Sequence, residues 1–149
     1  MEVEHRFAFA LQAPEGRARE LLFAPERVFA ALPGLEELKR EGARFSGRLC
    51  GEAPIFGRVC FPFESLVSGV ERAELAPVPL TEKHFWAELA GVGEARGNEL
   101  RYRVRLVLHA ELPAGEKWGG RALRRMAEAA LARNLTRVLA SLPERVEIG

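Results

Sequence analysis

The feature that most constrains this fold is a broad apolar stripe near the C-terminal end of the sequence. From Leu123 to Leu142, apolar residues recur at spacings of three and four, the period of one helix face, and the arginines fall largely off that stripe. Pro143 ends the pattern. The spacing predicts an amphipathic helix from roughly Lys117 to Leu142, which at 1.5 Å per residue would be about 37 Å long. Such a helix needs a large apolar surface to pack against.

The rest of the sequence predicts that surface, because its hydrophobic pattern changes to the period of two that is typical of strands. In the clearest case, residues 100–108, the even-numbered residues are apolar apart from Tyr102, whereas Arg101, Arg103 and Arg105 face the other way. Further strand-like segments are residues 2–12, 44–50, 55–63, 66–75 and 84–92. No long helix separates them, and a parallel crossover needs about a dozen residues or more, so we expect antiparallel pairing. The sequence thus predicts a curved antiparallel sheet of six or seven strands.

Short segments before residue 44 complete the predicted architecture. Residues 17–23 are expected to form a strand, and residues 24–32 a helix, in which Pro25 suits the first turn and Glu26 complements the helix dipole. Residues 35–40 can add a second short helical piece. We therefore expect an α+β fold, with a short helix pair near the N-terminus and the sheet wrapped around the long C-terminal helix. At 149 residues, the default is a single domain over residues 1–149.

Composition excludes several classes of protein. The net charge is +1 and the basic residues are spread along the chain, which argues against nucleic-acid binding. No apolar stretch approaches the length of about 18 residues that a membrane span requires, and no apolar signal core follows Met1, so a cytoplasmic protein without stable membrane insertion is expected. The acidic residues are all glutamates and amides are few, which suits a thermophile, although a GC-rich genome gives the same bias.

The sequence offers no catalytic motif, so we predict no catalytic residue, no cofactor and no metal site. Cys50 and Cys60 are the only cysteines, too few for a structural zinc site, and we expect them to be reduced and buried. His5, His84 and His109 are far apart and form no zinc-binding pair. Because the chain has no aspartate, it cannot form a Ser-His-Asp triad.

Several segments resemble a known superfamily. Residues 23–32, FAPERVFAAL, resemble the opening helix of the SRPBCC superfamily, which includes START-like domains and the birch-pollen-allergen family. Residues 32–38, LPGLEEL, followed by residues 41–47, EGARFSG, look closer to the G-type proteins associated with carbon monoxide dehydrogenase. The strand at 57–59 and the helix entry at 118–120 are compatible with that branch. The resemblance implies a helix-grip fold, whereas the added strand at residues 2–12 indicates a divergent branch.

The resemblance also implies a function, namely a binding or carrier module with an apolar cavity between the sheet and the C-terminal helix. Its ligand would be a lipid or other hydrophobic small molecule. The alternation of residues alone would equally describe a filled core. Tyr102 and Asn134 are candidates for fixing ligand orientation, although each is more simply a core residue with a satisfied polar group. The candidate cavity residues are Phe61, Phe63, Tyr102, Val104, Leu106, Met126, Leu131 and Asn134.

Two other functions stay open from the sequence alone. A relative of the G-type dehydrogenase proteins would be a non-catalytic accessory or assembly protein that acts through protein or membrane contacts. A cyclase-type enzyme is the third reading, and it would need an acid or base in the cavity, for which Tyr102 with Glu88 is the one weak pair. Whether the chain forms a homodimer or binds a protein partner is also open.

Overall fold

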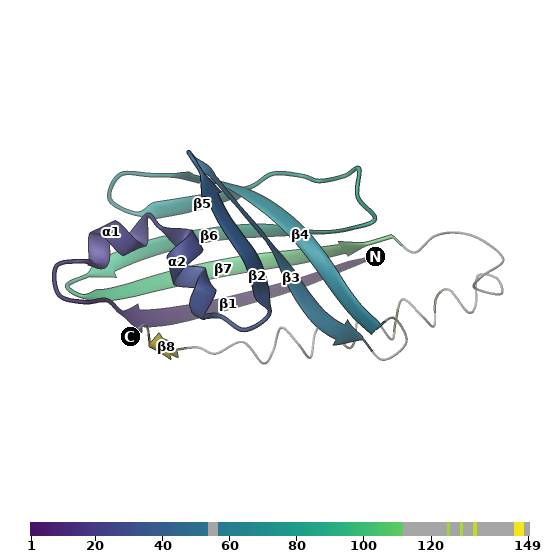
Figure 1. The fold of residues 1–149 in the computed structure, drawn as a ribbon, viewed down its shortest axis with the longest axis horizontal. Coiled ribbons are helices and arrows are strands. Elements are labelled where there is room, and N and C mark those ends of the chain that lie inside the picture. Colours follow the sequence, from purple (N-terminus) through teal and green to yellow (C-terminus); the bar gives the residue numbers. More distant parts are fainter. Residues whose placement is uncertain (54–56, 112–124, 126–128, 130–132, 134–144, 148–149) are drawn as a thin grey trace.

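A single curved sheet dominates the part of the chain that the structure describes. The computed structural model describes residues 1–53, 57–111 and 145–147, together with Arg125, Ala129 and Arg133. Within these residues the sheet has eight strands in the order β2-β3-β4-β5-β6-β7-β1-β8 (Figure 1). The strands are β1 (Glu2–Gln12), β2 (Leu35–Glu41), β3 (Arg44–Ala53), β4 (Gly57–Ser68), β5 (Ala73–Pro77), β6 (Phe85–Arg96), β7 (Glu99–Ala110) and β8 (Arg145–Glu147). The helices are α1 (Ala18–Leu22), α2 (Pro25–Val28) and the 3-10 turn η1 (Phe29–Ala31).

The pairing of strands confirms the predicted antiparallel sheet. Strands β1 to β7 pair antiparallel with their neighbours in the sheet order, while β8 pairs parallel with the end of β1. Strand β7 lies between β6 and β1, and alternation decides which of its side chains face the core. Leu100, Tyr102, Val104, Leu106 and Leu108 are buried, as predicted. The arginines at 101, 103 and 105 are exposed, also as predicted.

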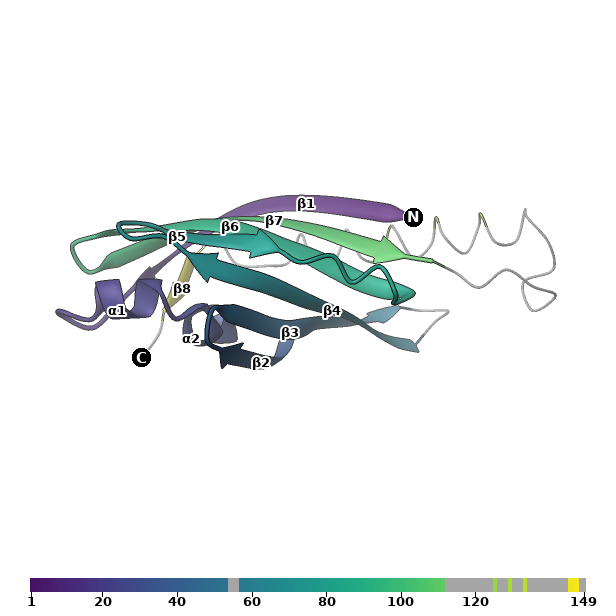
Figure 2. The ribbon, with the colours of Figure 1, turned by 90° about the horizontal axis from the view of Figure 1, so that it is seen from above.

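The sheet curls over its own inner face. Strand β4 pairs with β3 along its length and also with β5 and β6, so it joins the two parts of the sheet. Figure 2 shows β2 and β3 lying opposite β1 and β7, with β4 passing from one part to the other. Phe29 of η1 fills the space between them, with ring centroids 5.4 Å from those of Phe9 and Tyr102 and 5.7 Å from that of Phe45. Aromatic packing from both parts therefore closes this end of the core.

Residues 17–23 contain a helix rather than the strand expected from the sequence, because Ala18, Leu21 and Leu22 share one helical face. All three side chains are buried in α1. An ion pair between Arg17 and Glu20, 2.7 Å long, links positions three residues apart at the start of this helix. The apolar spacing in this short segment is thus helical.

The prediction of a second short helical piece at residues 35–40 is also wrong, because these residues form β2. Leu35 and Leu38 are three residues apart, which looks helical in the sequence. In the structure, β2 has a register shift between Glu36 and Lys39, and Glu37 adopts a φ of 51°. This bulge lets both leucines pack against the core, although they lie in a strand.

The curved antiparallel sheet with few helices is consistent with the expected helix-grip fold. Most of the predicted C-terminal helix lies outside the described residues. Of that segment the structure describes Arg125, Ala129 and Arg133, which have helical backbone and exposed side chains. Strand β8, after Pro143, is an addition to the predicted elements. Within the described part of the chain, no helix has the length and hydropathy needed to cross a bilayer.

Candidate ligand-binding face

The inner face of the sheet has two halves, and α1 and α2 lie over only one of them. Helix α1 contacts β6 and β7, and α2 contacts β2 and β3, so both helices lie over one end of the face (Figure 1). Leu21, Leu22, Val28 and Phe29 bring buried side chains to this end. We call the other end, which includes the beginning of β1 and the end of β7, the far half of the inner face.

Tyr102 belongs to the helix-covered half. Its ring stacks on Phe9, with centroids 5.8 Å apart, and lies directly against Gly93, where a Cβ atom would come within 2.5 Å of the ring. Its hydroxyl donates a hydrogen bond to the backbone carbonyl of Leu22. Burial raises the pKa of Tyr102, since the phenolate would lose its hydration. Tyr102 is therefore a buried residue whose hydroxyl has a backbone partner, and its predicted role in fixing a ligand stays a prediction.

The far half of the inner face is apolar and continuous. Phe61 of β4 and Leu106 of β7 are each 1% exposed, and Phe61 contacts Phe85 edge to face at 5.7 Å. At the margins of this half, several apolar side chains are only partly buried against the core. They are Val3, Phe7, Val59 and Phe85. These partly buried side chains give the far half an apolar margin that an apolar ligand could contact.

His5 is the polar member of this surface. It follows the alternation of β1, and its ring stacks on Phe7 at 5.8 Å, while Phe7 in turn stacks on Phe9 at 6.1 Å. The imidazole is half-buried and has no hydrogen bond or ion pair in the described part of the chain. His5 is not among the predicted cavity residues, although a histidine within an apolar row is visible in the sequence.

The structure places the predicted cavity residues only in part. Phe61, Phe63, Val104 and Leu106 are buried and share the inner face. Phe63 packs against Phe45 at 5.3 Å and so lies deeper toward β3. Met126, Leu131 and Asn134 lie outside the described residues. That these four and Tyr102 line a ligand cavity stays a prediction.

A hollow of about 1240 Å³ runs along β1. Six consecutive β1 residues, His5 to Ala10, take part in it, so it involves side chains from both faces of that strand. Its other lining residues are Val92, Glu94, Arg96, Glu99, Arg101, Tyr102 and Arg103. Four arginines and two glutamates give its lining an excess of positive charge.

The outer face of the sheet contradicts the acid–base pair considered from the sequence. A carboxylate oxygen of Glu88 lies 2.8 Å from Nε2 of His109, and Trp86 stacks on the same imidazole at 3.9 Å. Nδ1 of His109 lies 3.3 Å from Glu2. Tyr102 points to the opposite face, so Tyr102 and Glu88 do not form a pair. On the same outer face, Arg105 pairs with Glu4 of β1 at 2.8 Å.

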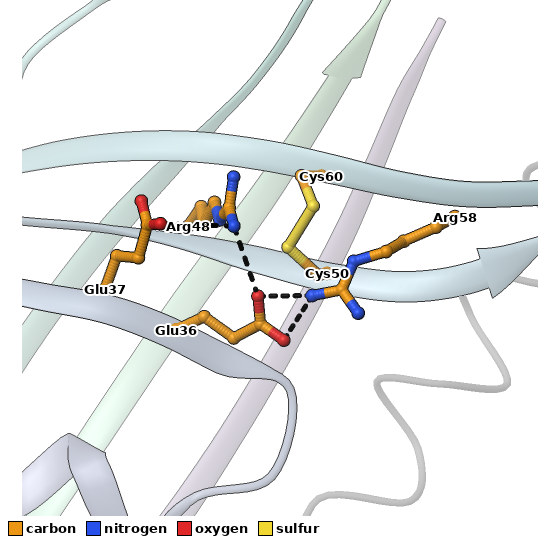
Figure 3. A network of polar contacts seen from close by, with 6 residues as sticks. All are labelled: Glu36, Glu37, Arg48, Cys50, Arg58 and Cys60. Carbon is orange, nitrogen blue, oxygen red and sulfur yellow. Dashed lines mark hydrogen bonds and ion pairs between the residues drawn. A yellow bond between two sulfur atoms is a disulfide. The ribbon is translucent and has the colours of Figure 1, made fainter.

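The cysteines are not reduced, in contrast to the prediction. Cys50 of β3 and Cys60 of β4 face each other in the antiparallel register, with Cα atoms 4.1 Å apart, and form a disulfide (Figure 3). The prediction relied on the expected compartment, whereas the pairing follows from a strand register that the sequence alone does not reveal. Glu36 binds Arg58 beside this disulfide and lies 3.6 Å from Arg48 (Figure 3).

Glu36 and the two sulfur atoms lie within 4.8 Å of one another, a spacing that suits metal ligands. The sulfurs are bonded to each other, however, and the carboxylate is engaged by two guanidinium groups. A thiolate must be free to bind a metal ion, so the bonded pair does not fit a metal centre.

Solved structures that resemble this chain include TTHA0849 from Thermus thermophilus, the Zhui aromatase/cyclase from Streptomyces sp. R1128 and DR_A0006 from Deinococcus radiodurans. The first is 23% identical in sequence, with a TM-score of 0.46. Its alignment covers 94% of this chain and 92% of the TTHA0849 chain. The second is 15% identical, with a TM-score of 0.43, and its alignment covers 94% of this chain and 93% of that chain. The third is 16% identical, with a TM-score of 0.40, and its alignment covers 94% of this chain and 99% of that chain.

No curated protein matches the chain. The model of one family, described as "Protein of unknown function (DUF3809)", matches residues 6–140. This match covers most of the sequence, and the chain therefore belongs to that family.

Proposed function

We propose that this chain is a binding or carrier module for a lipid or other hydrophobic small molecule. The observation that carries the proposal is the far half of the inner face, which is continuous and apolar and lies away from α1 and α2. Phe61 and Leu106 would form its floor, and the half-buried Val3, Phe7 and Phe85 its margin. The helix that the amphipathic pattern predicts over residues 123–142 would supply the opposite wall, to which Met126, Leu131 and Asn134 would contribute.

Affinity in such a site comes from removing carbon surface from water. Each Å² of apolar surface buried is worth about 25 cal/mol, so a ligand gains affinity without any chemical step. The resemblance of residues 23–47 to SRPBCC proteins supports the same function. The acid–base pair that a cyclase would need is not formed by Tyr102 and Glu88, so we propose binding rather than catalysis.

A blocking substitution tests this proposal directly. Purified protein is examined by native mass spectrometry for a co-purifying apolar molecule, and then titrated with Nile red, a neutral apolar dye. Val3→Trp adds bulk to the margin of the far half and should weaken dye binding severalfold. Val70→Trp is the matched control, because Val70 is 77% exposed in the turn before β5, and it should bind as the unsubstituted protein does.

Two results would contradict the proposal. The first is a protein that carries no apolar molecule and neither binds Nile red nor is stabilised by any lipid or aromatic compound. The second is dye binding that Val3→Trp and Val70→Trp weaken equally, since the dye would then lie elsewhere.

A further inference from the structure

The disulfide between Cys50 and Cys60 lies on the outer face of the sheet, apart from the candidate ligand-binding face. The cysteines are next to the core residues Leu49 on β3 and Phe61 on β4, so the alternation of each strand directs the sulfur atoms to the other face. Cys60 is half-buried, and a carboxylate oxygen of Glu36 on β2 lies within 4.8 Å of both sulfurs (Figure 3). Three neighbouring strands thus bring two sulfurs and a carboxylate together where solvent can reach them.

The carboxylate of Glu36 keeps capacity to bind a cation. Its two oxygens offer about four lone-pair sites. One nitrogen of Arg58 binds both oxygens, whereas the nearest nitrogen of Arg48 is 3.6 Å away, beyond hydrogen-bond distance. Carboxylates that bind a metal ion are normally held by hydrogen bonds from surrounding residues, and Arg58 is placed to hold Glu36 in this way. The guanidinium therefore orients the carboxylate and leaves lone pairs for a metal ion.

From this arrangement we infer that the reduced protein binds a Zn²⁺ ion through the thiolates of Cys50 and Cys60 and the carboxylate of Glu36. A thiol reductant supplies two electrons and two protons, which convert the Sγ–Sγ bond into two thiols while the reductant becomes a disulfide. Zn²⁺ then displaces the two thiol protons. The disulfide and the metal-bound form exclude each other, so the site exists only under reducing conditions. It is independent of the proposed binding of an apolar ligand.

The geometry and the donor set favour Zn²⁺. With Zn–S bonds of about 2.3 Å, two sulfurs in a tetrahedral site are about 3.8 Å apart. Facing residues whose Cα atoms are 4.1 Å apart can reach this separation by rotation of their side chains. Two thiolates exclude Mg²⁺ and Ca²⁺, which take oxygen ligands, and water would occupy the fourth position. Two thiolates and one carboxylate leave the complex with one net negative charge, which the adjacent guanidinium of Arg58 balances.

The test is Zn²⁺ binding to the full chain, measured by competition with a chromophoric chelator before and after reduction with a water-soluble phosphine. The reduced protein should bind one Zn²⁺ per chain, whereas the oxidised protein should not bind Zn²⁺ with comparable affinity. Glu36→Gln should weaken binding by at least the roughly 10–100-fold that loss of an outer-shell partner costs. Glu37→Gln is the matched control, because it makes the same change in charge at a carboxylate that pairs with Arg48 and is not in the group.

Several outcomes would overturn this inference. One is a reduced protein that binds no Zn²⁺, or binds it no better than the oxidised protein or a Cys50→Ser, Cys60→Ser double variant. Another is equal affinity of Glu36→Gln and Glu37→Gln, which would remove Glu36 from the site. Should reduction unfold the protein, circular dichroism gives the decision, since a metal ion that binds only the folded state restores it. Zn²⁺ should then refold the reduced protein and not its Glu36→Gln variant, and failure to do so would refute the site.

Discussion

Removal of the disulfide between Cys50 and Cys60 should lower the free energy of unfolding by about 2.7 kcal/mol. The bond joins residues ten positions apart, and a cross-link that closes a loop of this length removes roughly that much free energy from the unfolded chain at 25 °C. For a chain of this size the same loss corresponds to a decrease in Tm of about 5–10 °C. The loop is short, so the expected effect is smaller than that of a long-range disulfide.

The assay is urea unfolding followed by circular dichroism, for the unsubstituted protein and for a Cys50→Ser, Cys60→Ser double variant, each with and without dithiothreitol. The reductant should destabilise the unsubstituted protein to the level of the double variant and leave the double variant unchanged. Titration of free thiols after unfolding without reductant should find none in the unsubstituted protein. Two free thiols, or equal stability of all four samples, would refute the reasoning from loop closure.

Three further predictions concern the helix-covered half of the core. Gly93→Ala should lower the free energy of unfolding by about 1–3 kcal/mol, because the new Cβ would lie 2.5 Å from the Tyr102 ring; unchanged urea denaturation would contradict this contact. Tyr102→Phe should cost about 1–2 kcal/mol by leaving the Leu22 carbonyl without its donor. The raised pKa of Tyr102 also means that the folded state keeps a proton which the unfolded state releases near pH 10, so stability should fall as the pH rises above about 10, and less so in Tyr102→Phe. Phe29→Ala should cost about 3–5 kcal/mol in the same denaturation assay, since it removes a ring that contacts both parts of the sheet, and a loss under about 1 kcal/mol would show that this end can repack.

The long strands could be predicted from the sequence because their alternation is continuous. In β7 the apolar residues and the arginines separate without exception from Leu100 to Leu106, and one face is buried while the other is exposed. This pattern depends only on which side chains avoid water, so it can be seen without a knowledge of the neighbouring strands. The general position of the candidate site on the inner face follows from the same alternation.

Other features depend on contacts between distant residues and were not visible in the sequence. The bulge at Glu37 reverses the alternation of β2, so Leu35 and Leu38 looked helical. The disulfide depends on the register of β3 against β4. The hydroxyl of Tyr102 bonds to the carbonyl of Leu22, which is 80 residues away, and the local sequence around either residue gives no sign of that bond.

The position of β1 in the sheet has a consequence for the order of folding. Strands β2 to β5 pair with neighbours in the sequence, whereas β1 must find β7, and the Met1 amino group bonds to a carbonyl 109 residues away. Contacts that close such long loops form late, because the chain entropy is lost before the contact compensates for it. We therefore expect β1 to dock after the hairpins have formed. His5 would then reach its position only at the last step of folding. Ligand binding, measured during refolding, should therefore appear only when the sheet is complete.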